Sequence, residues 1–178
     1  MRRKSGFFMW VASLAAITLM VLALGVTSVA AQSPKTIKVG LILPLSGPSA
    51  SLGQYIREGM EFIADRVNQA GGIKSIGGAQ IVYEVADSRG QPEIGMSEAE
   101  RLILKEKVVA LTGCYNSGVT LTATTVAEKY GIPFVVVIST SDQITERGYK
   151  YTFRPHGNSS MDQKILVDFL IDINCFGF

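Results

Sequence analysis

Small and hydroxyl-bearing residues gather in three segments of this chain, each of which directly follows an apolar run. These hydroxyl-rich segments are PLSGPSASLG (44–53), GCYNSGVT (113–120) and STSDQIT (139–145). All three are poor in side chains that titrate. Hydroxyl groups and the free amides of helix N-termini bind an anionic group such as a carboxylate without adding a counter-charge. The composition of the segments therefore favours capture of a ligand over its chemical conversion.

Sequence patterns of the common enzyme classes are weak or missing. Gly47 and Gly53 do not have the G-x-G-x-x-G spacing of a dinucleotide site, although Asp87 would suit the acidic position of such a site. No G-x-S-x-G and no P-loop motif occurs. Cys114 has no histidine near it in the sequence, and the single histidine, His156, is more often a loop residue than a catalyst. We therefore expect no catalytic residue, no metal site and no cofactor.

Strand and helix patterns alternate from residue 35 onward. Apolar and β-branched runs predict strands over 36–43, 79–87, 107–113 and 132–138, with a short strand over 150–155. Apolar residues at helical spacing predict helices over 54–70, after Pro92, from about Thr120 to Tyr130, and after Ser159 or Ser160.

This alternation predicts an α/β fold, a doubly wound parallel sheet with helices on both of its faces. The run 132–138 is apolar on both faces and is predicted to be a central strand. In an open parallel sheet, ligands bind beyond the carboxyl ends of the strands, near the point at which the strand order reverses. We expect the three hydroxyl-rich segments to lie there. In the last helix, Ile165, Leu166, Phe169 and Ile173 are predicted to line one side.

The start of the chain has the composition of a secretory signal. Arg2, Arg3 and Lys4 precede an apolar run over 7–26, and small residues follow over 27–31. We expect a signal peptide over 1–31 and a mature chain that is periplasmic or secreted after signal cleavage. The alternative is an uncleaved membrane anchor, because a helix through the apolar run could cross a bilayer.

The charge of the chain does not favour nucleic acid as a partner. The sequence carries 17 Lys and Arg against 15 Asp and Glu, and three of the basic residues belong to the expected signal. The mature chain would be slightly acidic, without the clustered basic face that nucleic-acid binding needs. Cys114 and Cys175 are expected to be free thiols, because Cys114 follows a core strand and Cys175 lies in the C-terminal tail.

Four segments occur in the order seen in type I periplasmic binding proteins. They are IKVGLILPLSGPSASLGQ (37–54), GGIKSIGGAQIVYEVADSRGQPE (71–93), GCYNSGVT (113–120) and ERGYKYTFR (146–154). From about residue 35 to about residue 174, the chain resembles the solute receptors of branched-chain amino acid ABC transporters. The resemblance implies a receptor and not an enzyme, with a small-molecule ligand held between two α/β lobes and a membrane permease as partner. It assigns 35–174 to the N-terminal lobe.

The resemblance also implies which residues contact the ligand. The hydroxyl and amide of Ser117, the backbone of Ile138 and Ser139, and the hydroxyl of Thr140 would grip the carboxylate and ammonium groups of an amino acid. Two alternatives stay open, since Ser117 could be only an N-cap and Thr140 only a turn residue.

Ligand identity also stays open. Leu52 stands where leucine-type members present a tyrosine, and Tyr115 could be a wall of the site or a core aromatic residue. Because GCYNS resembles the amide- and urea-binding branch, an amide or urea is the alternative to a branched-chain amino acid. An exported α/β enzyme with a nucleophilic Cys114 is the alternative from another class.

The end of the sequence departs from the family pattern. After DFLIDIN (168–174), the chain ends in CFGF (175–178) and does not continue into a second lobe. We expect a truncated or frameshifted reading frame or a fragment, with 175–178 as an aberrant tail. Such a chain would expose apolar surface that the rest of the family fold covers.

Overall fold

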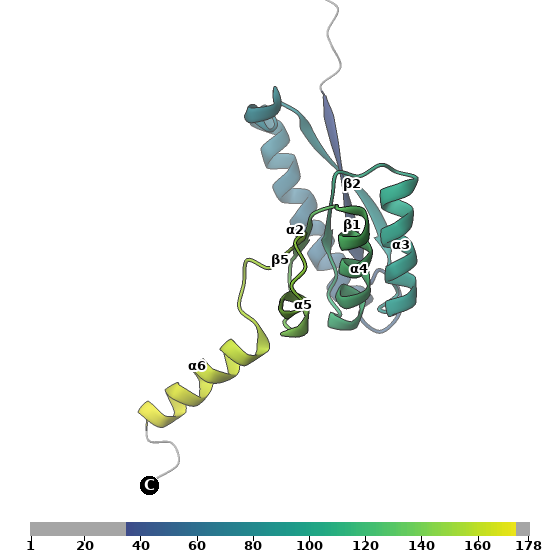
Figure 1. The fold of residues 1–178 in the computed structure, drawn as a ribbon. Coiled ribbons are helices and arrows are strands. Elements are labelled where there is room, and N and C mark those ends of the chain that lie inside the picture. Colours follow the sequence, from purple (N-terminus) through teal and green to yellow (C-terminus); the bar gives the residue numbers. More distant parts are fainter. Residues whose placement is uncertain (1–34, 174–178) are drawn as a thin grey trace, which may run out of the picture. The chain divides into compact units, whose positions relative to one another are not determined.

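Five parallel strands form one sheet in the computed structural model, which describes residues 35–173 (Figure 1). The strand order is β2-β1-β3-β4-β5, so the order reverses between β1 and β3. The expected signal over 1–31 and the tail over 175–178 lie outside the described residues. The strands are β1 (Thr36–Leu43), β2 (Gln80–Asp87), β3 (Ala110–Gly113), β4 (Phe134–Val136) and β5 (Thr152–Phe153).

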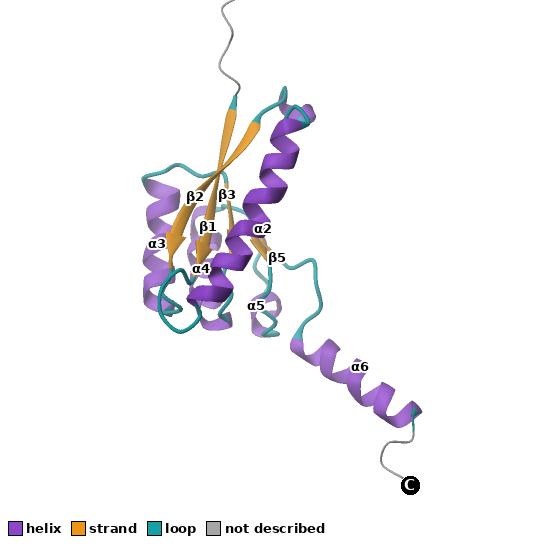
Figure 2. Cartoon of the chain, turned by 180° about the vertical axis from the view of Figure 1, so that it is seen from behind, coloured by secondary structure: helices purple, strands orange, loops and turns teal. Residues whose placement is uncertain are grey.

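Helices cover both faces of the sheet, as the sequence predicts. α3 and α4 pack against each other on one face, and α2 lies on the opposite face over β1 and β2 (Figures 1 and 2). Within 35–173, no helix is both long and apolar enough to cross a membrane. The helices are α2 (Ala50–Gln69), the short 3₁₀ helix η1 (Lys74–Ile76), α3 (Pro92–Leu104), α4 (Ser117–Tyr130), α5 (Gln143–Glu146) and α6 (Ser159–Asp172).

The hydrophobic core lies between the sheet and the α3–α4 layer. Ile42 and Leu111 of the sheet pack there with Leu102 of α3 and Val119 of α4, and all four side chains are fully buried. On the other face, the Asn68 side chain fastens the end of α2 to the edge strand β2. It accepts a hydrogen bond from the Ile81 amide at 2.8 Å and donates one to the Ile81 carbonyl at 2.9 Å.

β4 is a central strand of the sheet, as predicted, although it is not covered on both faces. It lies between β3 and β5, as a central strand should, but only one of its faces is buried. Val135 is 41% exposed, and Phe153, its neighbour in register on β5, is 52% exposed. The apolar run 132–138 therefore does not mark a strand covered on both faces, because α2 packs mainly against β1 and β2.

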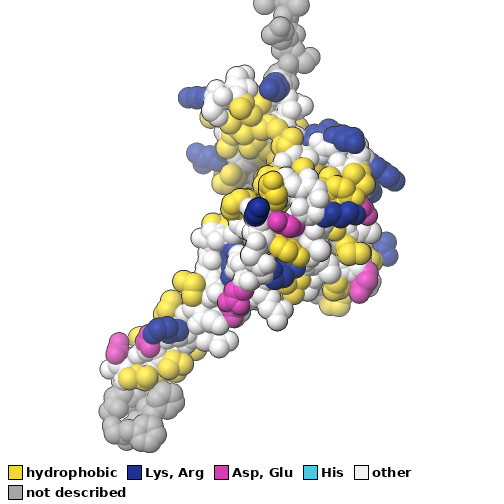
Figure 3. Space-filling view, viewed as in Figure 1, with side chains coloured by type: hydrophobic (Ala, Val, Ile, Leu, Met, Phe, Trp, Pro, Cys, Tyr) yellow, Lys and Arg dark blue, Asp and Glu magenta, His cyan; other side chains and the backbone are white. Residues whose placement is uncertain are grey.

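α6 forms as predicted, but its predicted apolar side is not packed. Ile165, Leu166, Phe169 and Ile173 are each more than half exposed, and α6 has no buried residue. Figure 3 shows hydrophobic side chains along this helix. Its N-cap is Asn158 instead of Ser159 or Ser160, and the Asn158 side chain accepts a hydrogen bond from the Met161 amide at 2.9 Å.

α2 begins at Ala50, four residues before the predicted start at residue 54. Its first helical hydrogen bond runs from the Gly53 amide to the Ser49 carbonyl at 3.1 Å. Gly53 is buried against the preceding loop, and a Cβ atom there would overlap the carbonyl oxygen of Pro44. The early start of the helix thus depends on a residue without a side chain.

We predict that Gly53→Ala destabilises the chain by about 2 kcal/mol or more, since the Pro44 backbone would have to move. Gly59 is the matched control, because it lies in the same helix and a Cβ there meets nothing within 4 Å. Gly59→Ala should stabilise the chain by roughly 0.5–1 kcal/mol. Urea unfolding followed by circular dichroism measures both changes. Equal changes in the free energy of unfolding for Gly53→Ala and Gly59→Ala would contradict the close packing of Gly53 against Pro44.

Candidate functional site

The parallel register brings the three hydroxyl-rich segments to one edge of the sheet. Ile42 of β1 pairs with Gly113 of β3, and Gly113 pairs with Val136 of β4. The segments that follow these strands therefore begin side by side at the carboxyl edge. The strand order reverses here between β1 and β3, which is where open α/β sheets bind ligands.

Three helices begin at this edge without a capping side chain. The residues that precede α2, α3 and α4 are Ser49, Gln91 and Asn116, and within the described chain none of them makes a side-chain capping bond. The first-turn amides of an uncapped helix remain available as donors, and the helix dipole adds positive potential at the same place. The edge is therefore suited to an anionic group of a ligand.

Ser117 is the first residue of α4 and not its N-cap. The helix starts three residues before the predicted start near Thr120, because the Thr120 amide already bonds to the Asn116 carbonyl at 3.0 Å. This position corrects the interpretation of Ser117 as a simple cap. Its hydroxyl and its amide belong to the first turn, where the free donors of α4 are.

Asn116 is a residue that the sequence analysis did not single out. Its side-chain Oδ1 atom is buried and has no hydrogen-bond partner among the described residues. The atom lies beside Gly90, where an added Cβ would be 3.3 Å away. An asparagine directly before a helix normally caps it, so the sequence alone would have suggested a structural role.

Ser139 turns its side chain away from solvent and fastens two loops together. Its hydroxyl is buried, with the residue 2% exposed, and lies 2.5 Å from the Thr120 hydroxyl. It also donates toward the backbone carbonyls of Cys114 and Tyr115, each at 3.2 Å. The side chain is thus occupied, and only the backbone of Ser139 could meet a ligand, which is the contact that the sequence analysis assigns to it.

Thr140 is engaged with the start of α6. Its carbonyl accepts hydrogen bonds from the Ser159 amide at 2.9 Å and the Ser159 hydroxyl at 3.1 Å, and the Ser159 hydroxyl also lies 3.1 Å from the Thr140 hydroxyl. The Thr140 hydroxyl can accept this bond and still donate its own proton to a ligand.

The remaining predicted contact residues lie on the same hydroxyl-rich segments or directly before one of them. Ile138 is partly exposed just after β4, Tyr115 is half-buried between β3 and α4, and Leu52 is exposed in the first turn of α2. The structure therefore places all six predicted residues at the carboxyl edge of the sheet, on three neighbouring segments.

Asp87 ends β2 at this edge, and its carboxylate binds the chain's own loops. It accepts hydrogen bonds from the amides of Leu45 and Arg89, both at 2.8 Å, and from the Ser46 hydroxyl at 2.6 Å. Burial alone would raise the pKa of this carboxyl, but the hydroxyl and the backbone donors outweigh burial and lower the pKa below its ordinary value. Asp87 is thus bound internally and is not placed as the acidic residue of a dinucleotide site.

Cys114 does not have the surroundings of a nucleophile. It is 1% exposed, and burial raises the pKa of its thiol to about 12 although a hydrogen bond with Thr120 opposes the shift. A reactive thiolate needs an electropositive, partly exposed environment. His156, for its part, places its Nδ1 atom 2.8 Å from the carbonyl oxygen of Gly157.

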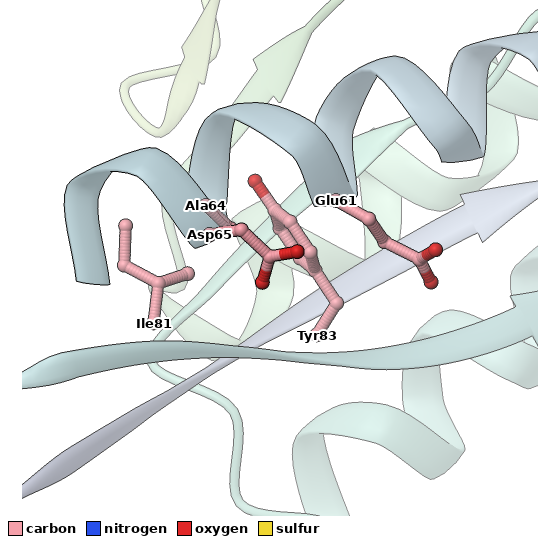
Figure 4. Close-up of a pocket in the computed structure, with 5 residues that line it drawn as sticks. All are labelled: Glu61, Ala64, Asp65, Ile81 and Tyr83. Atoms are coloured by element: carbon pink, nitrogen blue, oxygen red, sulfur yellow. The ribbon is translucent and has the colours of Figure 1, made fainter. Parts of the chain in front are cut away.

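A separate hollow of about 270 Å³ lies between α2 and the first half of β2 (Figure 4). Glu61 and Asp65 of α2 project beside Tyr83 of β2, and burial raises the pKa of the Tyr83 phenol. Two carboxylates in one hollow repel an anionic ligand. The lining residues also lie away from the carboxyl ends of the strands, so this hollow is not part of the candidate site.

Known proteins resemble the chain over most of its described length. A family model described as periplasmic binding protein matches residues 36–172. Leu/Ile/Val-binding protein homolog 8 of Brucella abortus (strain 2308) is 37% identical over 135 residues, which are 76% of this chain and 32% of that protein. The chain spans about a third of the length of the curated relatives it matches.

Solved structures agree with this match. The substrate-binding protein LivJ of a branched-chain amino acid transporter from Streptococcus pneumoniae, in complex with isoleucine, has a TM-score of 0.65 and 32% identity over 70% of this chain and 34% of that one. A solute-binding protein of an ABC transporter from R. palustris, in complex with benzoate, has a TM-score of 0.69 and 30% identity over 78% of this chain and 38% of that one. Because the family model covers well over half of the sequence, and the fold and the relatives agree with it, the chain belongs to the type I periplasmic binding proteins of the branched-chain amino acid family.

Proposed function

We propose that residues 35–174 are the N-terminal lobe of an extracytoplasmic solute receptor that delivers its ligand to the membrane permease of an ABC importer. Membership in the periplasmic binding proteins supports this function. The observation that carries it is the start of α4, where Ser117 and uncapped amides lie beside the loop that follows β4. The basic and apolar sequence over 1–31 would direct the chain out of the cytoplasm.

The proposed ligand is a branched-chain or related amino acid. Its carboxylate would accept hydrogen bonds from Ser117, from the first-turn amides of α4 and from the Thr140 hydroxyl, while the Ile138 carbonyl would accept from its ammonium group. Each bond to a charged group contributes roughly 1.5–3 kcal/mol. The donors are neutral, so they hold a zwitterion without offering an acid, a base or a nucleophile to transform it.

The ligands of the solved neighbours support recognition of a carboxylate more strongly than recognition of one particular ligand side chain. One neighbour holds isoleucine and another holds benzoate, and both ligands carry a carboxylate, whereas benzoate has no ammonium group. The acceptors at the site would decide between the two classes. An ammonium or amide donor of the ligand would need an exposed acceptor, and the Ile138 carbonyl is the proposed one, because Oδ1 of Asn116 is buried beside Gly90. An amino acid is therefore the proposed ligand, with an amide or urea as the alternative.

Two-lobed closure is the mechanism that we propose for the complete receptor. A ligand that touches both lobes selects the closed state, and the permease would recognise that state. The described residues supply one lobe and therefore one half of the grip. We expect the described lobe by itself to bind a ligand weakly, because a complete receptor would add a second set of contacts and would exclude water from the ligand.

We predict that isoleucine shifts the amide resonances of Ser117, Gly118 and Val119 in an NMR titration of the chain, with a Kd of about 1 mM or weaker. Ser117→Ala should weaken binding about tenfold or more, since a bond to a charged group is lost. Ser97→Ala on α3 is the matched control, because the Ser97 hydroxyl donates only to its own helix at Ile94.

Two results would contradict this proposal. If isoleucine shifts resonances elsewhere but not those of α4 and residues 138–140, the proposed site is wrong. A Kd of about 1 μM or tighter would contradict the expectation that one lobe supplies only half of the ligand contacts. Benzoate, acetamide and urea, titrated in the same way, compare the ligand classes.

The enzyme alternative yields a separate prediction for Cys114. Because burial raises the pKa of the Cys114 thiol to about 12, its thiolate is scarce at pH 7, so a maleimide should label it slowly in the folded chain and rapidly in urea. Peptide mapping by mass spectrometry separates Cys114 from Cys175. Rapid labelling of folded Cys114 at neutral pH would favour the enzyme instead.

A further inference from the structure

Four donors converge on the carboxylate of Asp87, and all of them belong to the two loops beside it. Oδ1 accepts from the amides of Leu45 at 2.8 Å, Arg89 at 2.8 Å and Ser46 at 3.3 Å. Oδ2 accepts from the Ser46 hydroxyl at 2.6 Å. A carboxylate offers about four acceptor positions, so these bonds leave little capacity for a ligand or a metal ion.

We propose that Asp87 is the positioning residue of the candidate site. Its carboxylate fixes the loop between β1 and α2 at Leu45 and Ser46, and this loop holds the uncapped start of α2 at the carboxyl edge. The inference deepens the proposed function and rests on it, because the edge that Asp87 organises is the edge proposed to bind the ligand.

The route of the backbone shows why this loop needs an anchor. Gly47 has a φ of 81°, and the Ala50 amide bonds back to its carbonyl at 3.1 Å, so the chain reverses sharply just before α2. Beyond the turn, Gly53 packs so closely against Pro44 that a Cβ atom at residue 53 would overlap the Pro44 carbonyl oxygen. Asp87 bonds to Leu45 and Ser46, which lie between Pro44 and Gly47, and Leu45 is 42 positions away from it in the sequence.

The anchor continues into the loop that follows β2. Arg89, whose amide also bonds to Asp87, has a φ of 53°, which is an uncommon conformation for a residue with a side chain. The next residue, Gly90, lies beside the Asn116 side chain just before α4, since a Cβ atom added at Gly90 would be 3.3 Å from the Asn116 Oδ1. One carboxylate therefore connects the start of α2, through a chain of contacts, to the start of the helix that carries Ser117.

The same carboxylate also balances charge at this edge. Several helix N-termini place positive potential there, and Asp87 neutralises part of it while its oxygens stay bound to the loops.

The test compares Asp87→Asn with Asp65→Asn in the full chain, by amide hydrogen exchange measured with NMR. Asp65 is the matched control, because it is an exposed carboxylate on α2 that lies away from these loops. Asp87→Asn should speed exchange of the Leu45 and Ser46 amides about tenfold or more relative to Leu41 in β1, since bonds to a charged acceptor are lost. Asp65→Asn should leave that ratio unchanged.

Ser46→Ala is the second variant, which keeps the test valid if Asp87→Asn does not fold. It removes only the hydroxyl bond to Oδ2 and should loosen the same two amides to a smaller extent. Unchanged local exchange in the folded variants, or a loss of protection spread evenly through β1, would overturn the positioning role.

An isoleucine titration separates this proposal from the proposed function. A positioning role predicts that Asp87→Asn weakens isoleucine binding severalfold, while Asp65→Asn does not. If the unchanged chain fails to bind isoleucine, the proposed function is contradicted for that ligand, and the exchange at Leu45 and Ser46 still decides whether Asp87 fixes the loop. Faster amide exchange at Leu45 and Ser46 without any change in the isoleucine Kd would contradict the proposal that Asp87 positions the ligand site.

Discussion

The parallel pairing of the strands is the constraint on which the rest of the structure depends. Because every strand runs in the same direction, each one ends at the same edge, and α2, α3 and α4 begin there. Their unpaired amides and positive dipole ends gather there, and these donors carry no formal charge of their own. Ser117 needs no special chemistry in this setting, since the topology has already placed donors around it. A receptor can be built in this way from residues that would be unremarkable elsewhere.

Polar contacts between loops hold that edge in one arrangement. Asp87 binds the loop after β1, and the buried Ser139 hydroxyl joins the loops after β3 and β4. Buried hydroxyls that are fully bonded make a region rigid, whereas unpaired ones would destabilise it. Cys114 shares this interior, and its burial suppresses the ionisation on which thiol chemistry depends. The polar groups nearest the site thus serve mainly to fix geometry, which suits binding better than catalysis.

Apolar surface is distributed unevenly over the described residues. The α3–α4 layer buries its face of the sheet, whereas Val135 and Phe153 remain open on the face where α2 covers only two strands. α6 adds a helix with no buried residue. Exposed patches of this kind mark surfaces that other protein covers or that cause aggregation. A chain with these residues uncovered should be handled as marginally soluble.

The sequence by itself determined the order and type of the elements and the family. Apolar periodicity, Pro92 and the glycine turns are local signals. They were enough to predict the alternation of strands and helices and the three hydroxyl-rich segments that follow strands. It also predicted that the candidate residues lie on segments at the carboxyl edge of the sheet, since strand direction follows from the α/β pattern.

Only the tertiary structure decided what those residues touch. Leu45 and Ser46, which donate to Asp87, lie more than 40 positions away from it in the sequence. The inward turn of Ser139 depends on Thr120 across two loops, and the start of α2 lies where Gly53 packs closely against Pro44. The open face of β4 likewise depends on how far α2 reaches. A local pattern records which faces are apolar, but it does not record which of them another element comes to cover, because that is set by packing between distant parts of the chain.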